Sequence, residues 1–276
     1  MNKIIAGGPP RDGIPALDEP KFVSAGGADF IRPEDSILGL VIDGVARAYP
    51  VKILNWHEIV NDQINDTPFI VTYCPLCASG AAYSPMVKGQ KFHFAVSGLL
   101  YNSNMLLFDR ETESLWSQVM GKAITGQYRG TSLKLLPLTH TSWKSWRAKY
   151  PETQVLSVET GFERDYDKNI YADYQKSDRI MFAVTNKPPE AYRNKEQVIG
   201  LQVGKLFKAY PFSELSKNGK ETFNDELDGK SFTVHWDEAS RIAYITDTDE
   251  NVMPVITSYL FAWFTFHPTT EFFEAR

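Results

Sequence analysis

The feature of this sequence that most constrains its fold is an internal repeat. Residues 39–54 match residues 200–215 without a gap at a constant offset of 161, and both segments carry Gly-Leu near the start and Ala-Tyr-Pro further on. A repeat of this kind indicates two related structural units within one chain. We therefore predict an internally duplicated protein.

Two further matches extend the repeat. Residues 61–73 match residues 224–236 at an offset of 163, and Trp146 aligns with Trp263 at an offset of 117. The drop from 163 to 117 makes the first unit longer by 46 residues, which fall after Cys74. Residues shared by both units are best explained by folding, so residues confined to the longer unit are the better candidates for chemistry.

The repeat divides the chain into four parts. Residues 1–36 are rich in Gly and Pro and are expected to form an extended N-terminal arm. We call residues 37–158 copy 1 and residues 198–276 copy 2. Between them, residues 159–197 are rich in charge, tyrosine and proline, and we call this polar segment the connector.

The residue pattern of both copies predicts a β-rich α+β fold with short helices. Asp43-Gly44 is a favoured hairpin dipeptide, and Pro50 suits the first turn of a helix. The β-branched and aromatic residues 69–73 predict a buried strand. Thr141 is the predicted N-cap of a helix that ends before Pro151.

Composition and charge exclude several classes of protein. Apolar residues make up 43% of the 276 residues and charged residues 23%, which is ordinary for a folded domain. The formal net charge of -5 comes without a basic stripe, so we expect no nucleic-acid partner. No apolar run approaches the roughly 20 residues that span a bilayer, so we expect no transmembrane segment.

The start of the chain bears on its location. The first ten residues lack the apolar stretch of a signal peptide. We expect either a cytoplasmic protein or the leaderless mature form of a periplasmic or extracellular one. The expected partner is a small molecule or a metal ion, and the sequence predicts no particular oligomeric state.

Both cysteines of the chain lie in one motif, Cys74-Pro75-Leu76-Cys77. The motif follows a predicted strand, and its proline restricts the turn. Cysteines at this spacing can both reach one metal ion or close one small disulfide ring. Two cysteines supply neither a disulfide framework nor a four-cysteine zinc site.

The first hypothesis is a soft-metal site, with or without enzymatic activity. Thiolates favour copper(I) or zinc(II), and we expect Cys74 and Cys77 to be two of the ligands. His57 is our choice for the third ligand because it is confined to copy 1, where the aligned position of copy 2 lies near Asn218. These three residues would also carry any catalysis.

Two alternatives stand beside the metal site. A thiol–disulfide oxidoreductase would use Cys74 as the attacking thiol and Cys77 as the resolving one, and His57 would then be a base that activates a cysteine. Thioredoxin-like proteins follow the first cysteine with a long helix, whereas Gly80 and Pro85 make any helix here short. We therefore rank metal binding above redox cycling. In the other alternative the thiols are structural, in a non-catalytic binding module.

A group of polar residues and one tryptophan in copy 1 predicts a substrate pocket. The expected substrate-binding residues are Asn102, Asn104, Asp109, Arg110 and Trp116. Polar loop residues also form turns and surface ion pairs, and tryptophan is common in cores, so roles in folding are the alternative.

Several motifs together resemble one known family. In chain order they are Ala46-Arg-Ala-Tyr-Pro50, Asn55-Trp-His-Glu-Ile-Val-Asn-Asp62, Val71-Thr-Tyr-Cys-Pro-Leu-Cys77, Val96-Ser-Gly-Leu-Leu-Tyr-Asn-Ser103 and Ser114-Leu-Trp-Ser-Gln118. Together with the opening segment Gly7-Gly-Pro-Pro-Arg-Asp-Gly-Ile-Pro-Ala-Leu17, they resemble the domain-of-unknown-function family DUF3179 of bacteria and archaea, with its Tyr-Cys-Pro-Leu-Cys signature, and the match runs over most of the chain. That family usually shows Gly-Ser-Ala after the second cysteine, where this chain has Ala78-Ser79-Gly80. Many relatives resemble exported or lipid-anchored proteins, and the resemblance implies no established activity.

Overall fold

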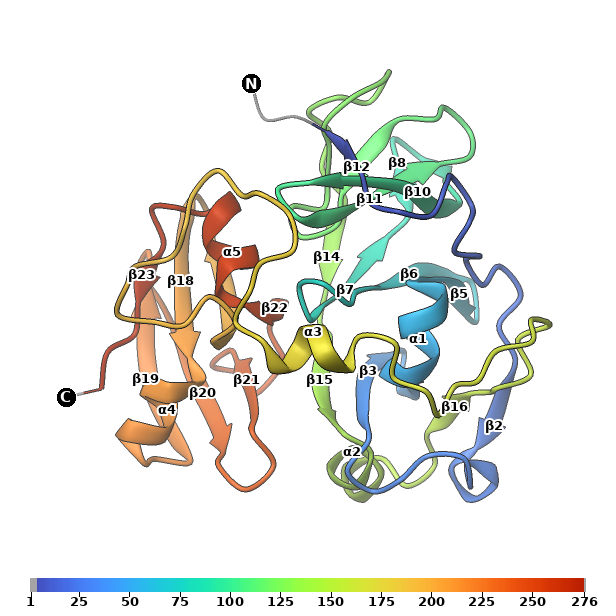
Figure 1. Cartoon of the computed structure of the whole chain (residues 1–276). Helices are drawn as coiled ribbons and strands as arrows, with labels where there is room; N and C mark the ends of the chain where they lie inside the picture. The colour runs from blue at the N-terminus through green and yellow to red at the C-terminus, as the bar shows by residue number, and fades with distance from the viewer. Residues whose placement is uncertain (1–3, 276) are drawn as a thin grey trace.

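The computed structural model describes residues 4–275, so residues 1–3 of the arm and Arg276 of copy 2 lie outside the described part. Over residues 4–275 the protein has five β-sheets and five short α-helices, which confirms a β-rich α+β fold. In Figure 1, copy 2 (orange to red) lies on the left, and the sheet of β10 and β11 lies above the rest of copy 1.

An eight-stranded sheet runs through both copies. Its order is β23-β18-β17-β22-β7-β6-β5, and β14 pairs with β7 outside this path. The two copies join where Gly80 of β7 lies opposite Thr257 of β22. The strands are β5 (Ile59–Ile64), β6 (Thr67–Cys74), β7 (Ser79–Ser84), β14 (Lys134–Leu136), β17 (Gln197–Val203), β18 (Leu206–Pro211), β22 (Val255–Tyr259) and β23 (Glu271–Phe272).

Two five-stranded sheets consist mainly of strands of copy 1, and each includes one strand of the arm. The first has the order β15-β3-β4-β16-β2, and the second β1-β10-β11-β12-β13. The strands of the first are β2 (Phe22–Ser24), β3 (Ser36–Ile42), β4 (Val45–Pro50), β15 (Thr139–Ser142) and β16 (Gln154–Leu156). The strands of the second are β1 (Ile5–Ala6), β10 (Phe94–Tyr101), β11 (Asn104–Asp109), β12 (Leu115–Ser117) and β13 (Lys122–Ala123).

Two small sheets remain. A three-stranded sheet of copy 2 consists of β19 (Thr222–Leu227), β20 (Lys230–Asp237) and β21 (Ile242–Thr246). A two-stranded sheet of copy 1 consists of β8 (Met86–Val87) and β9 (Gln90–Lys91).

The helices are all short. They are η1 (a 3-10 helix, Ala25–Gly27), α1 (Val51–His57), α2 (Trp143–Lys149), α3 (Ala172–Lys176), α4 (Phe212–Asn218) and α5 (Leu260–Phe266). Pro50 is the N-cap of α1 rather than its first residue. The predicted N-cap Thr141 is wrong by one position: Thr141 belongs to β15, and Ser142 caps α2 by accepting a hydrogen bond from the Ser145 N–H at 3.2 Å.

The predicted hairpin at Asp43-Gly44 is confirmed. These residues join β3 to β4 with φ values of 50° and 78°, and two left-handed residues match the twist of the flanking strands. The predicted strand at residues 69–73 is also confirmed, because it lies within β6 and is buried.

Both copies show the same order of elements. In copy 1 the order is β3-β4-α1-β5-β6-β7, and in copy 2 it is β17-β18-α4-β19-β20-β21. A strand, a helix and a strand then end each copy, as β15-α2-β16 and β22-α5-β23. Within these endings the indoles of Trp146 and Trp263 each donate a hydrogen bond at 3.0 Å, to Thr153 and Thr270 respectively.

The extra length of copy 1 forms the wall behind the cysteines. Residues 85–138 separate β7 from β15, whereas only residues 247–254 separate β21 from β22. The longer segment supplies β8 to β14, and with them much of an apolar cluster that packs against the end of β6. Copy 1 therefore encloses its β6–β7 hairpin on a side where copy 2 has no comparable insertion.

Candidate thiol site

The two cysteines lie on the tight turn between β6 and β7. Cys74 is the last residue of β6 and lies opposite Ser79 of β7, and the Cys77 N–H donates to the Cys74 carbonyl at 3.1 Å. Ala78 closes the turn with a φ of 45°, in the left-handed region. A strand, and not a helix, therefore follows the cysteines.

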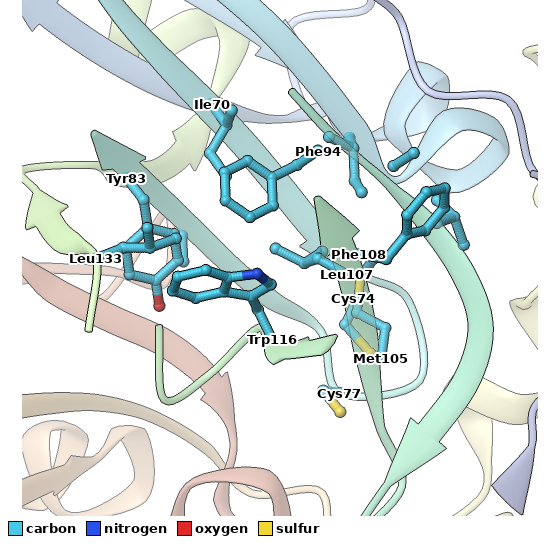
Figure 2. Packing of buried hydrophobic residues seen from close by; sticks show 14 of the residues in the cluster. Ile70, Cys74, Cys77, Tyr83, Phe94, Met105, Leu107, Phe108, Trp116 and Leu133 are labelled. Carbon is cyan, nitrogen blue, oxygen red and sulfur yellow. The ribbon is translucent and has the colours of Figure 1, made fainter. Parts of the chain in front are cut away.

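Both thiols are free and buried. Cys74 is 1% exposed and Cys77 is fully buried. Figure 2 shows them in the apolar cluster, where Met105, Leu107 and Phe108 lie beside Cys74. The Cys77 thiol donates to the Ser103 carbonyl at 3.4 Å and accepts a hydrogen bond from the Asn104 amide at 3.5 Å.

A buried amide network holds Asn104 in place. Its amide nitrogen donates to the Gln118 side-chain oxygen at 3.0 Å, and its side-chain oxygen accepts from the Val119 N–H at 3.1 Å. Gln118 in turn accepts from the Ser79 hydroxyl at 2.7 Å and donates to the Thr72 hydroxyl at 3.2 Å. This network fixes the donor beside Cys77 to both strands of the cysteine hairpin.

The two thiols titrate differently. Burial acts to raise the pKa of Cys74, but a hydrogen bond from the Cys77 thiol opposes it. Hydrogen bonding by the backbone N–H groups of Met105, Cys77 and Leu76 adds to this effect, so the pKa of Cys74 lies below its ordinary value. Burial raises the pKa of Cys77 well above its ordinary value, and the neighbouring Cys74 raises it further. The pair therefore loses its first proton as a Cys74 thiolate and keeps the second on Cys77.

Glu58 is a buried acid near the thiols. It follows α1 in a left-handed conformation, with a φ of 57°, and its carbonyl accepts from the N–H of Tyr73, the residue before Cys74. Burial raises the pKa of its carboxyl well above the ordinary value, and the charge of Cys74 adds to the shift. Glu58 can therefore accept or release a proton closer to neutral pH than an exposed glutamate.

The turn between β20 and β21 in copy 2 has the same geometry. Asp237 lies opposite Ile242 at the end of its hairpin, and Cys74 lies opposite Ser79 at the end of the other. Arg241 closes this turn with a φ of 53°, against 45° for Ala78. At the offset of 163, Asp237 occupies the position of Cys74.

Asp237 shows what this turn can bind. Its carboxylate accepts hydrogen bonds from the backbone N–H groups of Ala239 at 3.0 Å and Ser240 at 3.2 Å. The residues aligned with these two are the ones whose N–H groups act on the sulfur of Cys74. The turn therefore directs backbone N–H groups at the side chain in this position, which is a carboxylate in copy 2 and the Cys74 sulfur in copy 1.

His57, the expected third ligand, has protein partners on both ring nitrogens. Nδ1 is 2.8 Å from the Pro15 carbonyl oxygen and Nε2 is 2.7 Å from the Tyr166 hydroxyl. Burial lowers the pKa of this imidazole. Across residues 4–275 no group of three or more His, Cys, Asp and Glu side chains is arranged to hold a metal ion.

The five expected substrate-binding residues all have hydrogen-bond or ion-pair partners within the protein. Asn104 contacts the Cys77 thiol, as described above. Asn102 accepts hydrogen bonds from the backbone N–H and the hydroxyl of Thr185 in the connector, at 3.1 Å and 2.7 Å. Asp109 accepts from the indole of the fully buried Trp116 at 2.8 Å. Arg110 lies at the surface and pairs with carboxylates of the arm.

The connector covers the cysteine turn. The hydroxyl of Tyr174 in α3 donates to the Leu76 carbonyl at 2.9 Å. Lys195 is 7% exposed and its ammonium lies 3.1 Å from the centre of the Tyr174 ring. Burial lowers the pKa of Lys195 to about 8. In Figure 1, α3 (yellow) crosses the middle of the molecule, in front of the region where the two copies meet.

The sequence interpretation missed several residues of the site. Gln118 ends the motif Ser114–Gln118 and Glu58 directly follows His57, so both lie in segments that the sequence singles out. Tyr174 and Lys195 lie in the connector, which has no repeat and no motif to single them out.

A family model described as "Protein of unknown function (DUF3179)" matches residues 11–255, so the chain belongs to this family. No curated protein and no solved structure matches the chain. Within residues 4–275, no helix is both long and apolar enough to cross a membrane.

Proposed function

We propose that this member of the DUF3179 family is a thiol–disulfide oxidoreductase that uses Cys74 as the attacking thiolate and Cys77 as the resolving thiol. One observation carries the proposal. The turn that holds the Asp237 carboxylate in copy 2 holds Cys74 in copy 1, with hydrogen bonding from the aligned backbone N–H groups. A thiolate is the nucleophile in thiol–disulfide exchange, so a site that stabilises it is suited to this reaction.

The reaction balances with a disulfide as the oxidant. The Cys74 thiolate attacks one sulfur of a substrate disulfide and expels the other sulfur as a thiolate. Cys77, after losing its proton, attacks the Cys74 sulfur and releases the rest of the substrate as a second thiolate. The protein is oxidised to a Cys74–Cys77 disulfide, and the substrate gains the two electrons.

Glu58 supports the second step as a proton acceptor. Burial raises the pKa of the Cys77 thiol, so a base is needed before this residue can attack. Burial also raises the pKa of the Glu58 carboxyl, and the charge of Glu58 contributes to the raised pKa of Cys77. A carboxylate with a raised pKa is better matched to a thiol than an exposed one.

Substrate access depends on the connector. Both thiols are buried, and Tyr174 is bonded to the turn that carries them. A substrate disulfide therefore reaches Cys74 only when the connector moves away from the turn. This predicts slow reaction with large disulfides and faster reaction with small ones.

We also infer that copy 1 and copy 2 arose by duplication, with the chemistry confined to copy 1. The matching order of elements, the matched Trp–Thr hydrogen bonds and the matched turns support this inference. The parts of the chain remain as defined above: an arm over 1–36, copy 1 over 37–158, a connector over 159–197 and copy 2 over 198–276.

The test of the redox function is equilibration with glutathione buffers of graded potential. Mass spectrometry should show the loss of two hydrogen atoms from the protein at a defined potential, and Cys74→Ser and Cys77→Ser should both abolish it. Asp237→Ser, at the aligned turn, should leave the transition unchanged. A protein that keeps two free thiols in the most oxidising buffer would contradict the proposal.

A soft-metal site for copper or zinc is the second candidate, because an enclosed thiolate pair admits an ion more readily than a large substrate. Copper(I) accepts two thiolates, so Cys74 and Cys77 suffice as ligands, and His57 could join them only by giving up its bond to Pro15 or Tyr166. Elemental analysis of protein purified without chelator decides between the two. About one copper or zinc per chain, lost in Cys74→Ser, would favour the metal. If the protein contains no metal and forms no disulfide, the thiols are structural groups of a non-catalytic binding module.

A further inference from the structure

A cavity of about 370 Å³ opens beside the cysteine turn. Tyr73 and Ala78, which flank residues 74–77 in the sequence, both line this cavity. Tyr259 lines it as well, and its backbone N–H donates to the Cys77 carbonyl at 2.8 Å. The cavity therefore gives a small molecule a way towards thiols that are themselves buried.

Three hydroxyl groups and one carboxyl group around this turn have no hydrogen-bond partner among residues 4–275. They belong to Tyr73, Tyr171, Tyr259 and Glu58. Tyr73, Glu58 and Tyr259 are only 2%, 7% and 8% exposed. None of the four groups is among the unpartnered polar atoms that are completely enclosed, so they border space that a small molecule can enter. Buried polar groups are normally bonded, and four unpartnered ones at a single turn indicate a polar ligand.

The same four groups lie near the sulfurs. Burial raises the pKa of all four, and in each case the charge of Cys74 or Cys77 adds to the shift. Burial and the sulfurs therefore favour the protonated forms of the three phenols and of the carboxyl. In these forms each group donates a hydrogen bond.

The surroundings favour a compact, uncharged reactant. Tyr174 covers the turn that carries both buried thiols, which hinders a large disulfide. Two cationic and two acidic side chains balance each other on the cavity rim, namely Arg32, Lys52, Asp35 and Asp167. Hydroperoxides are compact and uncharged, their oxygen atoms accept hydrogen bonds, and a thiolate is the form of cysteine that they oxidise.

We propose that the cysteine pair reduces a small hydroperoxide, with Glu58 as the proton donor to the leaving oxygen and Tyr171 and Tyr259 as hydrogen-bond donors that hold the peroxide. This assignment rests on the proposed use of Cys74 as the attacking thiolate and Cys77 as the resolving thiol. It names an oxidant that reaches Cys74 without displacement of the connector.

The reaction proceeds in two balanced steps. The Cys74 thiolate attacks the terminal oxygen of the hydroperoxide, so an S–O bond forms and the O–O bond breaks. The leaving oxygen takes the proton of Glu58 and departs as an alcohol, or as water when the substrate is hydrogen peroxide. Cys77 then passes its proton to the Glu58 carboxylate and attacks the Cys74 sulfur, and the hydroxide that leaves becomes water with a proton from the solvent. The two thiols are oxidised to a disulfide, and the peroxide gains the two electrons.

Mass spectrometry of the reduced full chain after mixing with hydrogen peroxide tests the proposal. The disulfide should form at least tenfold faster than free cysteine reacts at the same concentration of thiolate. Cumene hydroperoxide, which carries a bulky aromatic group, should react at least tenfold more slowly than hydrogen peroxide. Cys77→Ser should stop after the gain of one oxygen atom, as the sulfenic acid, and Cys74→Ser should not react.

The proton donor is identified from two reactions of the same thiolate. Iodoacetamide alkylates the sulfur and expels iodide, which needs no proton, whereas the leaving oxygen of a peroxide needs one. Glu58→Gln should therefore slow the reaction with peroxide by about 100-fold without slowing the alkylation. Tyr171→Phe and Tyr259→Phe should each slow the peroxide reaction about tenfold, again without slowing the alkylation.

A matched control is Tyr192→Phe. Tyr192 is also a connector tyrosine, and its ring stacks on Phe272, but only burial and nearby carboxylates raise its pKa, with no contribution from the cysteines. This variant should react with peroxide like the wild type. Thermal unfolding establishes that each variant is folded, and three separate substitutions keep the test valid if one of them is not.

A reaction with hydrogen peroxide no faster than that of free cysteine would overturn the proposal. Equal slowing of both reactions in Glu58→Gln would also overturn it, because it would show a loss of access rather than of proton transfer. Equilibration with glutathione buffers separates this failure from that of the oxidoreductase itself. A disulfide that forms in these buffers without a fast peroxide reaction would remove only the peroxide as substrate, whereas no disulfide with either oxidant would contradict both proposals.

Discussion

Copy 1 and copy 2 use the same frame for different purposes. At the corresponding turn, copy 1 has two buried thiols under the connector, whereas copy 2 has the exposed Asp237 carboxylate. Backbone N–H groups of the turn face the Asp237 carboxylate in copy 2 and the Cys74 sulfur in copy 1. The comparison teaches that the same turn geometry can lie at the surface, as in copy 2, or be enclosed by residues 85–138 and the connector, as in copy 1.

The largest expected effect concerns the glycine beneath each tryptophan. A Cβ added at Gly39 would lie 2.3 Å from the ring of Trp146, and one added at Gly200 would lie 2.3 Å from the ring of Trp263. Gly39→Ala and Gly200→Ala should each destabilise the protein by about 3 kcal/mol or more, because the rings are packed and cannot move aside. Urea unfolding measures the loss.

The control for this pair is Gly26→Ala, where an added Cβ meets only the Ser24 hydroxyl at 4.0 Å. This variant should unfold within about 0.5 kcal/mol of the wild type. A large loss in only one copy would break the comparison, because it would show that the two tryptophan contacts are not equivalent.

The second prediction separates the two copies by burial. In copy 1 Asp62 pairs with Arg47 at 2.5 Å, with side chains 5% and 14% exposed; in copy 2 Asp225 pairs with Lys208 at 2.7 Å, with side chains 20% and 13% exposed. Asp62→Asn should cost about 3 kcal/mol because it leaves a buried guanidinium without its charge partner. Asp225→Asn should cost about 1 kcal/mol, since water reaches its carboxylate more easily.

Denaturant unfolding of both variants at low and high salt checks this difference. The loss in Asp225→Asn should shrink at high salt, whereas the loss in Asp62→Asn should change little. Equal losses in both variants at either salt concentration would contradict the difference in burial.

The order of strands and helices could be predicted well because segments of residues 37–158 match segments of residues 198–276. The hairpin at Asp43-Gly44 follows from local turn chemistry, whereas Gly39 and Trp146 stand out only because they align with Gly200 and Trp263. The prediction that Thr141 is the N-cap was wrong because Ser142, beside it, is an equally good capping residue. The position where β15 ends determines which of the two caps the helix.

The site was less predictable because its partners come from unrepeated segments. His57 was expected beside the thiols, but its ring nitrogens are bonded to Pro15 of the arm and Tyr166 of the connector. Spacing in the sequence gives no information about such contacts between distant segments. The same holds for Tyr174, which reaches the cysteine turn across 98 positions.

The third prediction concerns the pH dependence of stability, and it compares His267 with Tyr150, the residue aligned with it in copy 1. Both rings lie 4.3 Å from the tryptophan of their own copy. Burial lowers the pKa of His267 from 6.5 to about 4, so between these values the unfolded chain binds a proton that the folded chain does not. Stability should therefore fall as the pH drops from 6.5 to 4.

His267→Tyr should remove this part of the acid sensitivity. The variant should lose less stability than the wild type between pH 6.5 and pH 4, by about 2 kcal/mol after allowance for the partial exposure of the ring. Unfolding curves at several pH values measure the difference. An unchanged pH dependence in the variant would show that the ring of His267 is protonated equally well in both states.

The smallest effect concerns the residue that closes each turn. Ala78 and Arg241 have φ values of 45° and 53°, a conformation that favours glycine, so Ala78→Gly and Arg241→Gly should each stabilise the protein by about 0.5–1 kcal/mol. Gly80→Ala, by contrast, should destabilise it, because the added Cβ would lie 2.6 Å from Leu38. The order Ala-Ser-Gly in this chain therefore places the strained residue in the turn and the glycine where the core requires it. If thermal unfolding shows Ala78→Gly to be stabilising and Arg241→Gly not, the two turns differ in a way that their backbone angles do not reveal.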